Sequence, residues 1–333
     1  MLFSVFSGGA FAEGQAADGF RPLGILTIGF ENDVLVGNDN HYTSGLSLGW
    51  TTAELNTLGP KNVFSQAMNV FSFVPPLRRA SNKKYVNFSV VQEMYTPVDI
   101  ASVTPPPEDQ PYAGVLMADL NLLSKSVRSL HHVGLSGGVV GPASGAQWVQ
   151  EKFHEWVGAE IPQGWNSQLG NELLLNVAYQ YHRRVRRATK ADGVDFDLSL
   201  NGGGSLGNYL TGANGGALFR FGSSLPDTYG SFALRRGGES YAGLETSSTS
   251  WRWFLFAHLN GLGVAQFIPT DGNSFRESAV GHRDSFSVAL SSGFLVVYRR
   301  FLMTYSMNTA TYNGGFPRNN DENYGSITLS FVL

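Results

Sequence analysis

The amino-acid sequence predicts an all-β protein, a transmembrane antiparallel β-barrel of about 12 strands with a short amphipathic helix in an extracellular loop. Three observations lead to this prediction: apolar residues alternate with small or polar ones, aromatic residues gather near strand ends, and charged residues are scarce. The 333 residues include 40 Gly and 13% aromatic residues, whereas only 15% are charged. Because disordered chains are poor in aromatic residues, this composition excludes disorder.

The composition also excludes other classes of protein. A membrane-spanning helix needs about 20 consecutive apolar residues, and the sequence has no such run. The net charge is -3 without a basic stripe, so we expect no nucleic-acid partner. The absence of Cys excludes disulfide scaffolds and thiolate metal sites.

Residues 1–20 do not resemble part of a fold. A short apolar stretch precedes Ala10-Phe11-Ala12, which has the small-x-small pattern of a signal-peptide cleavage site, although a positively charged leader is missing. The alternative is a flexible terminus with an accidental match. We expect 1–20 to be a signal-peptide remnant and flexible N-terminus, and 21–333 to form a single outer-membrane barrel domain.

Alternation with a period of two begins at Leu23 and continues to the C-terminus. Successive side chains of a strand face opposite sides of the sheet, so each alternating stretch has one apolar face and one small or polar face. We expect strands near 23–32, 42–53, 84–96, 112–124, 131–141, 169–186, 194–204, 208–222, 250–267, 284–298, 301–312 and 324–333.

A soluble sandwich would alternate in the same way, with its apolar face inward. Here the polar face is rich in Gly, Ser and Asn, and Tyr and Trp lie near strand ends, as in the aromatic girdles of outer-membrane barrels. A sheet in lipid pairs all its backbone hydrogen bonds only by closing. The last stretch, which ends at Leu333, resembles the C-terminal signal of such barrels, although a terminal Phe is usual.

Two connections exceed the short periplasmic turns that such barrels have. They are 54–83, in which 64–71 is expected to form a small helix on the rim, and 223–249, which is rich in Gly and Ser. Either these connections are large or they conceal a further pair of strands.

Residues 142–158 interrupt the alternation and predict a short helix between the fifth and sixth strands. Ser144 and Gln147 have the spacing of a capping box, and Gly158 fits the helix end. The helix is amphipathic. Its apolar stripe consists of Val149, Phe153, Trp156 and Val157, and its polar stripe consists of Gln147, Gln150, Glu151 and His154.

Several residues with useful chemistry fall on one rim of this barrel. If the N-terminus is periplasmic, Asn32-Asp33 and Thr43 flank the first extracellular connection, Asp109-Gln110 close the next, and His154 lies in the third. Each has a structural explanation as well, because Asx residues favour turns and a lone His on a loop helix is commonly solvated. Their shared rim favours a functional site.

The chemistry of these residues is consistent with ester hydrolysis. Asn32, Asp33 and Thr43 offer hard oxygen donors, the ligands that a calcium ion takes. A neutral His with a pKa of about 6.5 can accept a proton from water at neutral pH. A nearby cation can stabilise the developing oxyanion, so no serine nucleophile is required.

The sequence resembles the lipid A 3'-O-deacylase family in a series of ordered motifs between residues 23 and 186, while the later strands agree only in pattern. The motifs are Phe30-Glu31-Asn32-Asp33, His41-Tyr42-Thr43-Ser44-Gly45-Leu46, Asp109-Gln110-Pro111-Tyr112-Ala113-Gly114, Gly141-Pro142 and Gln147-x-x-Gln150-x-x-x-His154-x-x-x-Gly158-Ala159-Glu160. Residues 102–108 differ from a Lys-containing stretch of some members.

The resemblance implies a twelve-stranded bacterial outer-membrane barrel, with an active site between the wall and the loop helix that faces the outer leaflet. It implies a Ca2+-dependent hydrolase that releases the 3'-linked acyloxyacyl chain of lipid A with water activated by a histidine. The expected catalytic residues are His154, Asn32, Asp33, Thr43 and Gln150, and the expected metal ligands are Asp33, Asn32, Thr43 and Glu160.

The expected partners are lipid A, as part of lipopolysaccharide, and outer-membrane lipids, and we expect a monomer. Two other functions fit the barrel pattern. A non-catalytic porin or adhesin would show no hydrolysis, and an outer-membrane phospholipase would differ in substrate. Known enzymes of the latter kind use a Ser–His–Asn site, and no Ser motif accompanies His154.

Overall fold

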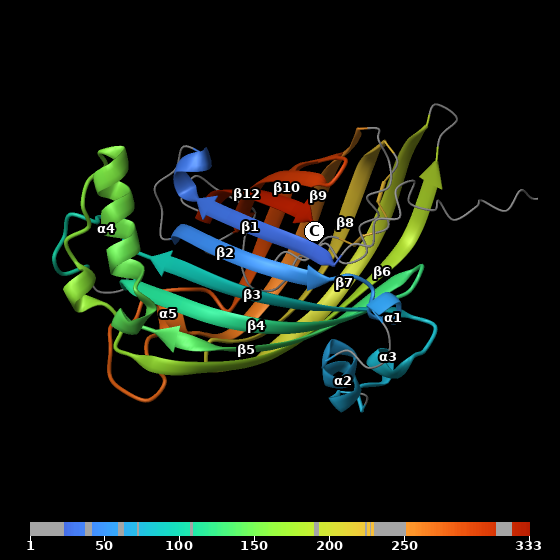
Figure 1. Ribbon diagram of the computed structural model, residues 1–333. Coiled ribbons are helices and arrows are strands. Elements are labelled where there is room, and N and C mark those ends of the chain that lie inside the picture. The colour runs from blue at the N-terminus through green and yellow to red at the C-terminus, as the bar shows by residue number, and fades with distance from the viewer. Residues whose placement is uncertain are drawn as a thin grey trace, which may run out of the picture.

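The computed structural model describes residues 23–36, 42–58, 63–71, 73–106, 109–189, 193–223, 225–226, 228–229, 251–310 and 322–333. Twelve antiparallel strands within these ranges form a closed barrel (Figure 1). Closure occurs where β1 (Gly24–Asn32) pairs with β12 (Glu322–Val332), while its other edge pairs with β2 (Tyr42–Thr52). The expected barrel is confirmed. The expected segment 1–20 lies outside the described residues.

The remaining strands follow one another around the wall, each paired with its neighbour in sequence. They are β3 (Lys83–Tyr95), β4 (Ala113–Lys125), β5 (Ser129–Val140), β6 (Glu172–Thr189), β7 (Val194–Gly207), β8 (Leu210–Ser223), β9 (Arg252–Phe267), β10 (Phe286–Tyr298) and β11 (Phe301–Ala310). Each expected strand overlaps one of them. β6 extends three residues beyond the expected end at 186.

Helices lie at both ends of the barrel (Figure 1). One end, called here the α4 rim, carries η1 (Asp33–Val36), η2 (Pro142–Ser144), α4 (Ala146–Val157), η3 (Trp165–Ser167) and α5 (Ile268–Asp271). The other end, the α2 rim, carries α1 (Leu55–Leu58), α2 (Val63–Val70) and α3 (Pro75–Arg78). Among the described residues, no helix has the length and apolar character needed to cross a membrane.

The connection 54–83 is a large connection and, in its described part, not a concealed pair of strands. Its described residues form α1, α2 and α3 and no strand, and α2 confirms the expected helix near 64–71. Leu55, Met68 and Leu77 bury their side chains against the strands, which anchors the three helices to the wall. The connection 223–249 lies mostly outside the described residues.

The outer face of the wall is apolar and the inner face polar. Ile28 on β1 is 54% exposed, whereas its neighbours Thr27 and Gly29 belong to the opposite face, where Thr27 is buried and contacts Ser330. On the inner face, Asn87 of β3 donates a hydrogen bond to Thr51 of the neighbouring strand β2 (3.1 Å). Because buried polar groups require partners, the interior is lined with amides and hydroxyls that bond one another.

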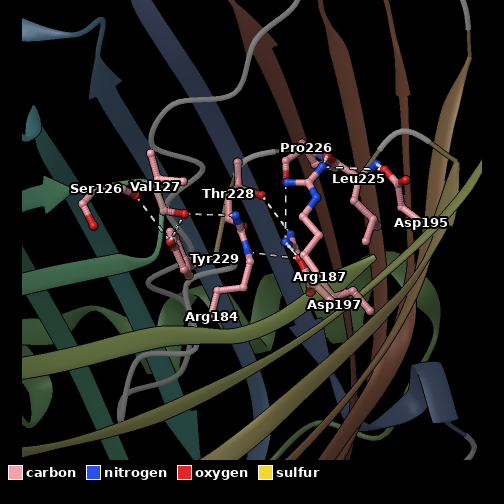
Figure 2. A network of polar contacts seen from close by, with 11 residues as sticks. Ser126, Val127, Arg184, Arg187, Asp195, Asp197, Leu225, Pro226, Thr228 and Tyr229 are labelled. Atoms are coloured by element: carbon pink, nitrogen blue, oxygen red, sulfur yellow. Dashed lines mark hydrogen bonds and ion pairs between the residues drawn. The ribbon is translucent and has the colours of Figure 1, made fainter. Parts of the chain in front are cut away.

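A short segment after β8 turns into the barrel at the α2 rim (Figure 2). We call its described residues, Leu225, Pro226, Thr228 and Tyr229, the latch. Asp197 on β7 accepts hydrogen bonds from Arg220 (2.9 Å and 2.5 Å) and lies 3.3 Å from Arg184. Both arginines then donate to Thr228 of the latch, at 3.3 Å and 3.2 Å.

The latch also reaches the turn between β4 and β5 (Figure 2). The Tyr229 hydroxyl donates to the carbonyl oxygen of Val127 (3.0 Å), and its ring lies 4.6 Å from the Arg184 guanidinium carbon. The buried Asp197–Arg220–Arg184 group therefore links β6, β7 and β8 to a segment that reaches the β4–β5 turn.

Candidate active site

Helix α4 lies against the outer face of the barrel wall. Phe153 of α4 packs on Phe30 of β1, with ring centroids 6.1 Å apart. Phe30 belongs to the same outward face of β1 as the exposed Ile28. A second contact joins the start of the helix to β3, where the Gln92 amide donates to the carbonyl oxygen of Ser144 (2.7 Å).

The approach of α4 to the wall depends on Gly114 of β4. A Cβ atom at Gly114 would lie 2.3 Å from Ser144 Oγ and 2.4 Å from Ala146 Cβ. Only glycine therefore lets the start of the helix sit directly on the strand. Ala146 is buried there beside Met94 and Trp165.

The helix begins one residue later than the capping-box spacing predicted. The N-cap is Gly145, with φ 69° and ψ 7°, which has no side chain with which to cap the helix. The Ser144 hydroxyl instead accepts a hydrogen bond from the backbone N–H of Ala146 (3.3 Å). The expected capping box is wrong because the left-handed turn at Gly145 separates η2 from α4. Gly158, with φ 73°, ends the helix as expected.

The face of α4 that meets the wall includes part of the predicted polar stripe. Gln150 is 2% exposed, whereas Trp156 is 82% exposed and Trp148 also faces outward. The helix therefore presents aromatic side chains to its surroundings. Such side chains suit the boundary between lipid and water, where an apolar body and a polar tip are both accommodated.

Asn32 and Asp33 lie where β1 ends, two and three residues beyond Phe30. Both side chains are buried, and Asp33 is only 1% exposed. Asp33 begins η1, which folds over the end of β12: a Cβ atom at Gly325 would lie 2.5 Å from Leu35 Cβ. The packing of η1 therefore places an acidic residue in a protected position on this rim.

Thr43 occupies an irregular position in β2. Tyr42 pairs with Tyr95 and Ser44 pairs with Met94, so the backbone has one extra residue at Thr43, which is a β-bulge. The side chain of Thr43 lies outside the described part of the structure. Bulges re-aim side chains and are common beside active sites.

His154 has a defined hydrogen bond at the end of α4. Its Nδ1 lies 2.5 Å from the backbone carbonyl oxygen of Glu160. A carbonyl oxygen can only accept, so Nδ1 carries the proton and Nε2 of the neutral ring is the acceptor. Glu160 is exposed, and its observed contact with His154 is through its backbone.

Gln150 contacts Trp165 of η3, a residue that the sequence patterns did not single out. The Trp165 indole N–H donates to Gln150 Oε1 at 2.7 Å, and both side chains are buried. Trp165 also packs on Tyr112, with ring centroids 5.1 Å apart. Burial raises the pKa of Tyr112, so its hydroxyl stays protonated and donates to the carbonyl oxygen of Ile100 (3.0 Å).

Asp109 and Gln110 lie on the same rim but do not belong to the contacts of Gln150 and His154. The buried Gln110 donates to the carbonyl oxygen of Pro269 (2.6 Å) and accepts from Thr270 (3.0 Å). These bonds hold the β3–β4 connection to α5, so Gln110 stabilises the rim. By contrast, Phe153 brings α4, with Gln150 and His154, to the end of β1 that carries Asn32.

No group of three or more His, Cys, Asp or Glu residues suited to a metal ion occurs within the described ranges. A cation at the end of β1 would have the Asp33 carboxylate and the amide oxygen of Asn32 as oxygen donors. Calcium accepts this mixture of oxygen ligands. The donor chemistry fits calcium.

Comparisons with known proteins agree with this description. The whole chain, residues 1–333, matches the family model for outer membrane protein LpxR. Among solved structures, LpxR from Salmonella typhimurium matches with a TM-score of 0.71 and 19% identity, covering 93% of this chain and 100% of that chain. The β domain of the Bordetella autotransporter BrkA has a TM-score of 0.43 and 9% identity, over 93% and 96%. No curated protein matches the chain significantly.

Proposed function

Since the chain belongs to the outer membrane protein LpxR family, we propose that it is a Ca2+-dependent lipid A 3'-O-deacylase of the bacterial outer membrane. It hydrolyses the ester that holds the 3'-linked acyloxyacyl chain. The observation that carries the proposal is the position of α4. Phe153 holds this helix on the outer wall against Phe30, so that His154 lies at the same rim as Asn32 and Asp33.

A site on the outer wall suits a substrate that resides in the membrane. A lipid can reach it laterally without entering the barrel. We place the α4 rim at the outer leaflet, where the exposed Trp148 and Trp156 of α4 lie at the level of the lipid headgroups.

His154 is the general base in this proposal. The Glu160 carbonyl holds the Nδ1–H tautomer, so Nε2 takes a proton from water. The water oxygen bonds to the ester carbonyl carbon, and the bond from that carbon to the sugar 3' oxygen breaks. His154 then gives the proton to the departing oxygen, which leaves a free fatty acid and a 3' hydroxyl.

Asp33, Asn32 and Thr43 would hold calcium, and Glu160 is a fourth candidate ligand. When bound, the ion would stabilise the negative charge that develops on the carbonyl oxygen. Burial of Asp33 keeps this carboxylate away from bulk water, which strengthens its attraction to a cation.

The described structure favours this function over both alternatives. A porin requires an open lumen, but here the latch lies inside the α2 rim and joins β6 and β8 to the β4–β5 turn. A phospholipase with a Ser–His–Asn site requires a serine hydroxyl on its histidine. In the described residues the polar contact of His154 is with a backbone carbonyl.

Mass spectrometry of lipid A tests the proposal. The chain is produced in a bacterium that lacks 3'-O-deacylase activity, and membranes are incubated with calcium or with a chelator. We expect lipid A to lose its 3'-linked acyl group only with calcium, and not with His154→Ala. Unchanged lipid A, with the barrel proven to be folded by its gel shift on boiling, would refute the function, and accumulating lysophospholipid would identify a phospholipase.

A further inference from the structure

The orientation of the Gln150 side-chain amide is determined by Trp165. An indole N–H can donate a hydrogen bond but cannot accept one. The atom of Gln150 that lies 2.7 Å from Trp165 Nε1 is therefore the carbonyl oxygen Oε1. The NH2 group of the same amide therefore points away from Trp165.

The NH2 group of Gln150 is buried. Its Nε2 atom has no hydrogen-bond partner among the described residues, and the whole side chain is 2% exposed. A buried donor without a partner is unfavourable, and native proteins contain few of them. The fold therefore leaves the Gln150 NH2 group in a buried position without an acceptor among the described residues.

The buried donor lies near the proposed base. Gln150 and His154 are four residues apart on α4, so their side chains project from the same side of the helix one turn apart. The helix touches the wall through Phe153, which lies between them in sequence. An ester carbonyl held for attack by water from His154 would thus have a preorganised donor close by.

We propose that Trp165 is a positioning residue, which holds the Gln150 amide so that its NH2 group donates to the carbonyl oxygen of the lipid ester. This inference rests on the proposed function and assigns a role to Gln150 within it. The hydrogen bond strengthens as the carbonyl oxygen gains negative charge, because a preorganised donor costs no reorganisation at that moment. Trp165 thereby acts through Gln150 without touching the substrate.

The competing explanation is that Trp165 only packs the rim. It is 1% exposed and adjoins Tyr112, Met94 and Ala146. Packing would affect folding or α4 placement whatever residue stands at 150. If Trp165 acts through Gln150, exchanging Trp165 should instead have no effect on kcat once the Gln150 amide has been removed.

The test compares Trp165→Phe, Gln150→Ala and the double variant in the full chain, purified in detergent, with kcat and KM measured for lipid A hydrolysis. We expect Gln150→Ala to lower kcat about 100-fold, the usual effect of removing one oxyanion donor. Trp165→Phe should lower kcat by roughly tenfold, because the amide is present but no longer held. The double variant should match Gln150→Ala, with KM nearly unchanged throughout.

Three further variants separate the donor role from packing. Gln150→Glu can still accept from Trp165 but offers no N–H, so it should lose kcat like Gln150→Ala while keeping the gel shift of a folded barrel. Tyr112→Phe removes a hydroxyl from the same aromatic pair without changing the Gln150 contact. Trp251→Phe makes the same exchange at a residue stacked on Tyr298, away from α4. Both controls should keep the kcat of the unmodified chain.

Each contrary result has a distinct meaning. If Trp165→Phe lowers kcat by the same factor with and without Gln150→Ala, Trp165 only packs and the inference is overturned. Full activity of Gln150→Glu would also overturn it. An unmodified chain that is folded but leaves lipid A intact refutes the proposed function itself, and the inference with it.

Discussion

Phe153 of α4 and Phe30 of β1 pack together on the outside of the barrel, with ring centroids 6.1 Å apart. The two residues come from distant parts of the sequence, and their contact joins the loop helix to the first strand. His154 follows Phe153 directly, and Asn32 lies two residues beyond Phe30. The two halves of the proposed site therefore depend on one aromatic pair.

Phe153→Ala should weaken deacylation without unfolding the barrel. An aromatic pair contributes about 0.5–1.5 kcal/mol beyond its buried area, so kcat/KM should fall roughly 2- to 10-fold as α4 loosens. Phe275→Ala is the matched control, because Phe275 is an exposed side chain of the α4 rim. Equal activity of the two variants would mean that α4 is held by other contacts.

Gly114→Val should displace the start of α4. Even a Cβ atom at this position meets Ser144 Oγ at 2.3 Å and Ala146 Cβ at 2.4 Å. We expect loss of most deacylase activity with the gel shift of the folded barrel retained, since β4 itself tolerates Val. Gly137→Ala, whose nearest neighbour would be 3.8 Å away, should remain active. A fully active Gly114→Val would contradict the close packing of α4 on β4.

Asp33→Ala should abolish activity at every calcium concentration, because it removes the carboxylate assigned to the ion. Asp33→Asn keeps the size and one oxygen ligand, so activity should return partly, at higher calcium. The measurement is a calcium titration of lipid A deacylation after chelation. Asp99→Asn, which alters an exposed acidic residue on the same rim, should leave the calcium requirement unchanged. Full activity of Asp33→Ala would show that the metal assignment is wrong.

Asp197→Ala should destabilise the barrel and open its α2 rim. It leaves Arg184 and Arg220 as buried charges without their carboxylate, and breaking such a group costs about 3–5 kcal/mol. We expect the gel shift to occur at lower temperature and ion conductance across a planar bilayer to rise above that of the unmodified chain.

Lys152→Ala provides the comparison for Asp197→Ala, since it removes an exposed ion pair with Glu155. Exposed pairs contribute about 0–1 kcal/mol, so stability and conductance should not change. If Asp197→Ala stayed as stable and non-conducting as Lys152→Ala, the latch would not seal this end.

The strands were predictable because their signal is local. Alternation with a period of two continues for the length of each strand, and each expected stretch overlaps one of the twelve strands of the closed barrel. The long connection 54–83 gave no such signal, and its helices α1 to α3 hold few residues each. The start of α4 was misplaced because Ser144 and Gln147 have the right spacing, but Gly145 turns the backbone between them.

The barrel, the end of α4 and the shared rim of Asn32, Asp33 and His154 were predictable from the sequence, since antiparallel neighbours place alternate connections at the same end. Tertiary structure decided which face of α4 meets the wall. Gln150 is buried there because Gly114 admits the helix and Trp165 supplies a donor from a separate turn. Spacing along a chain cannot reveal such contacts, because they arise only when distant segments pack together.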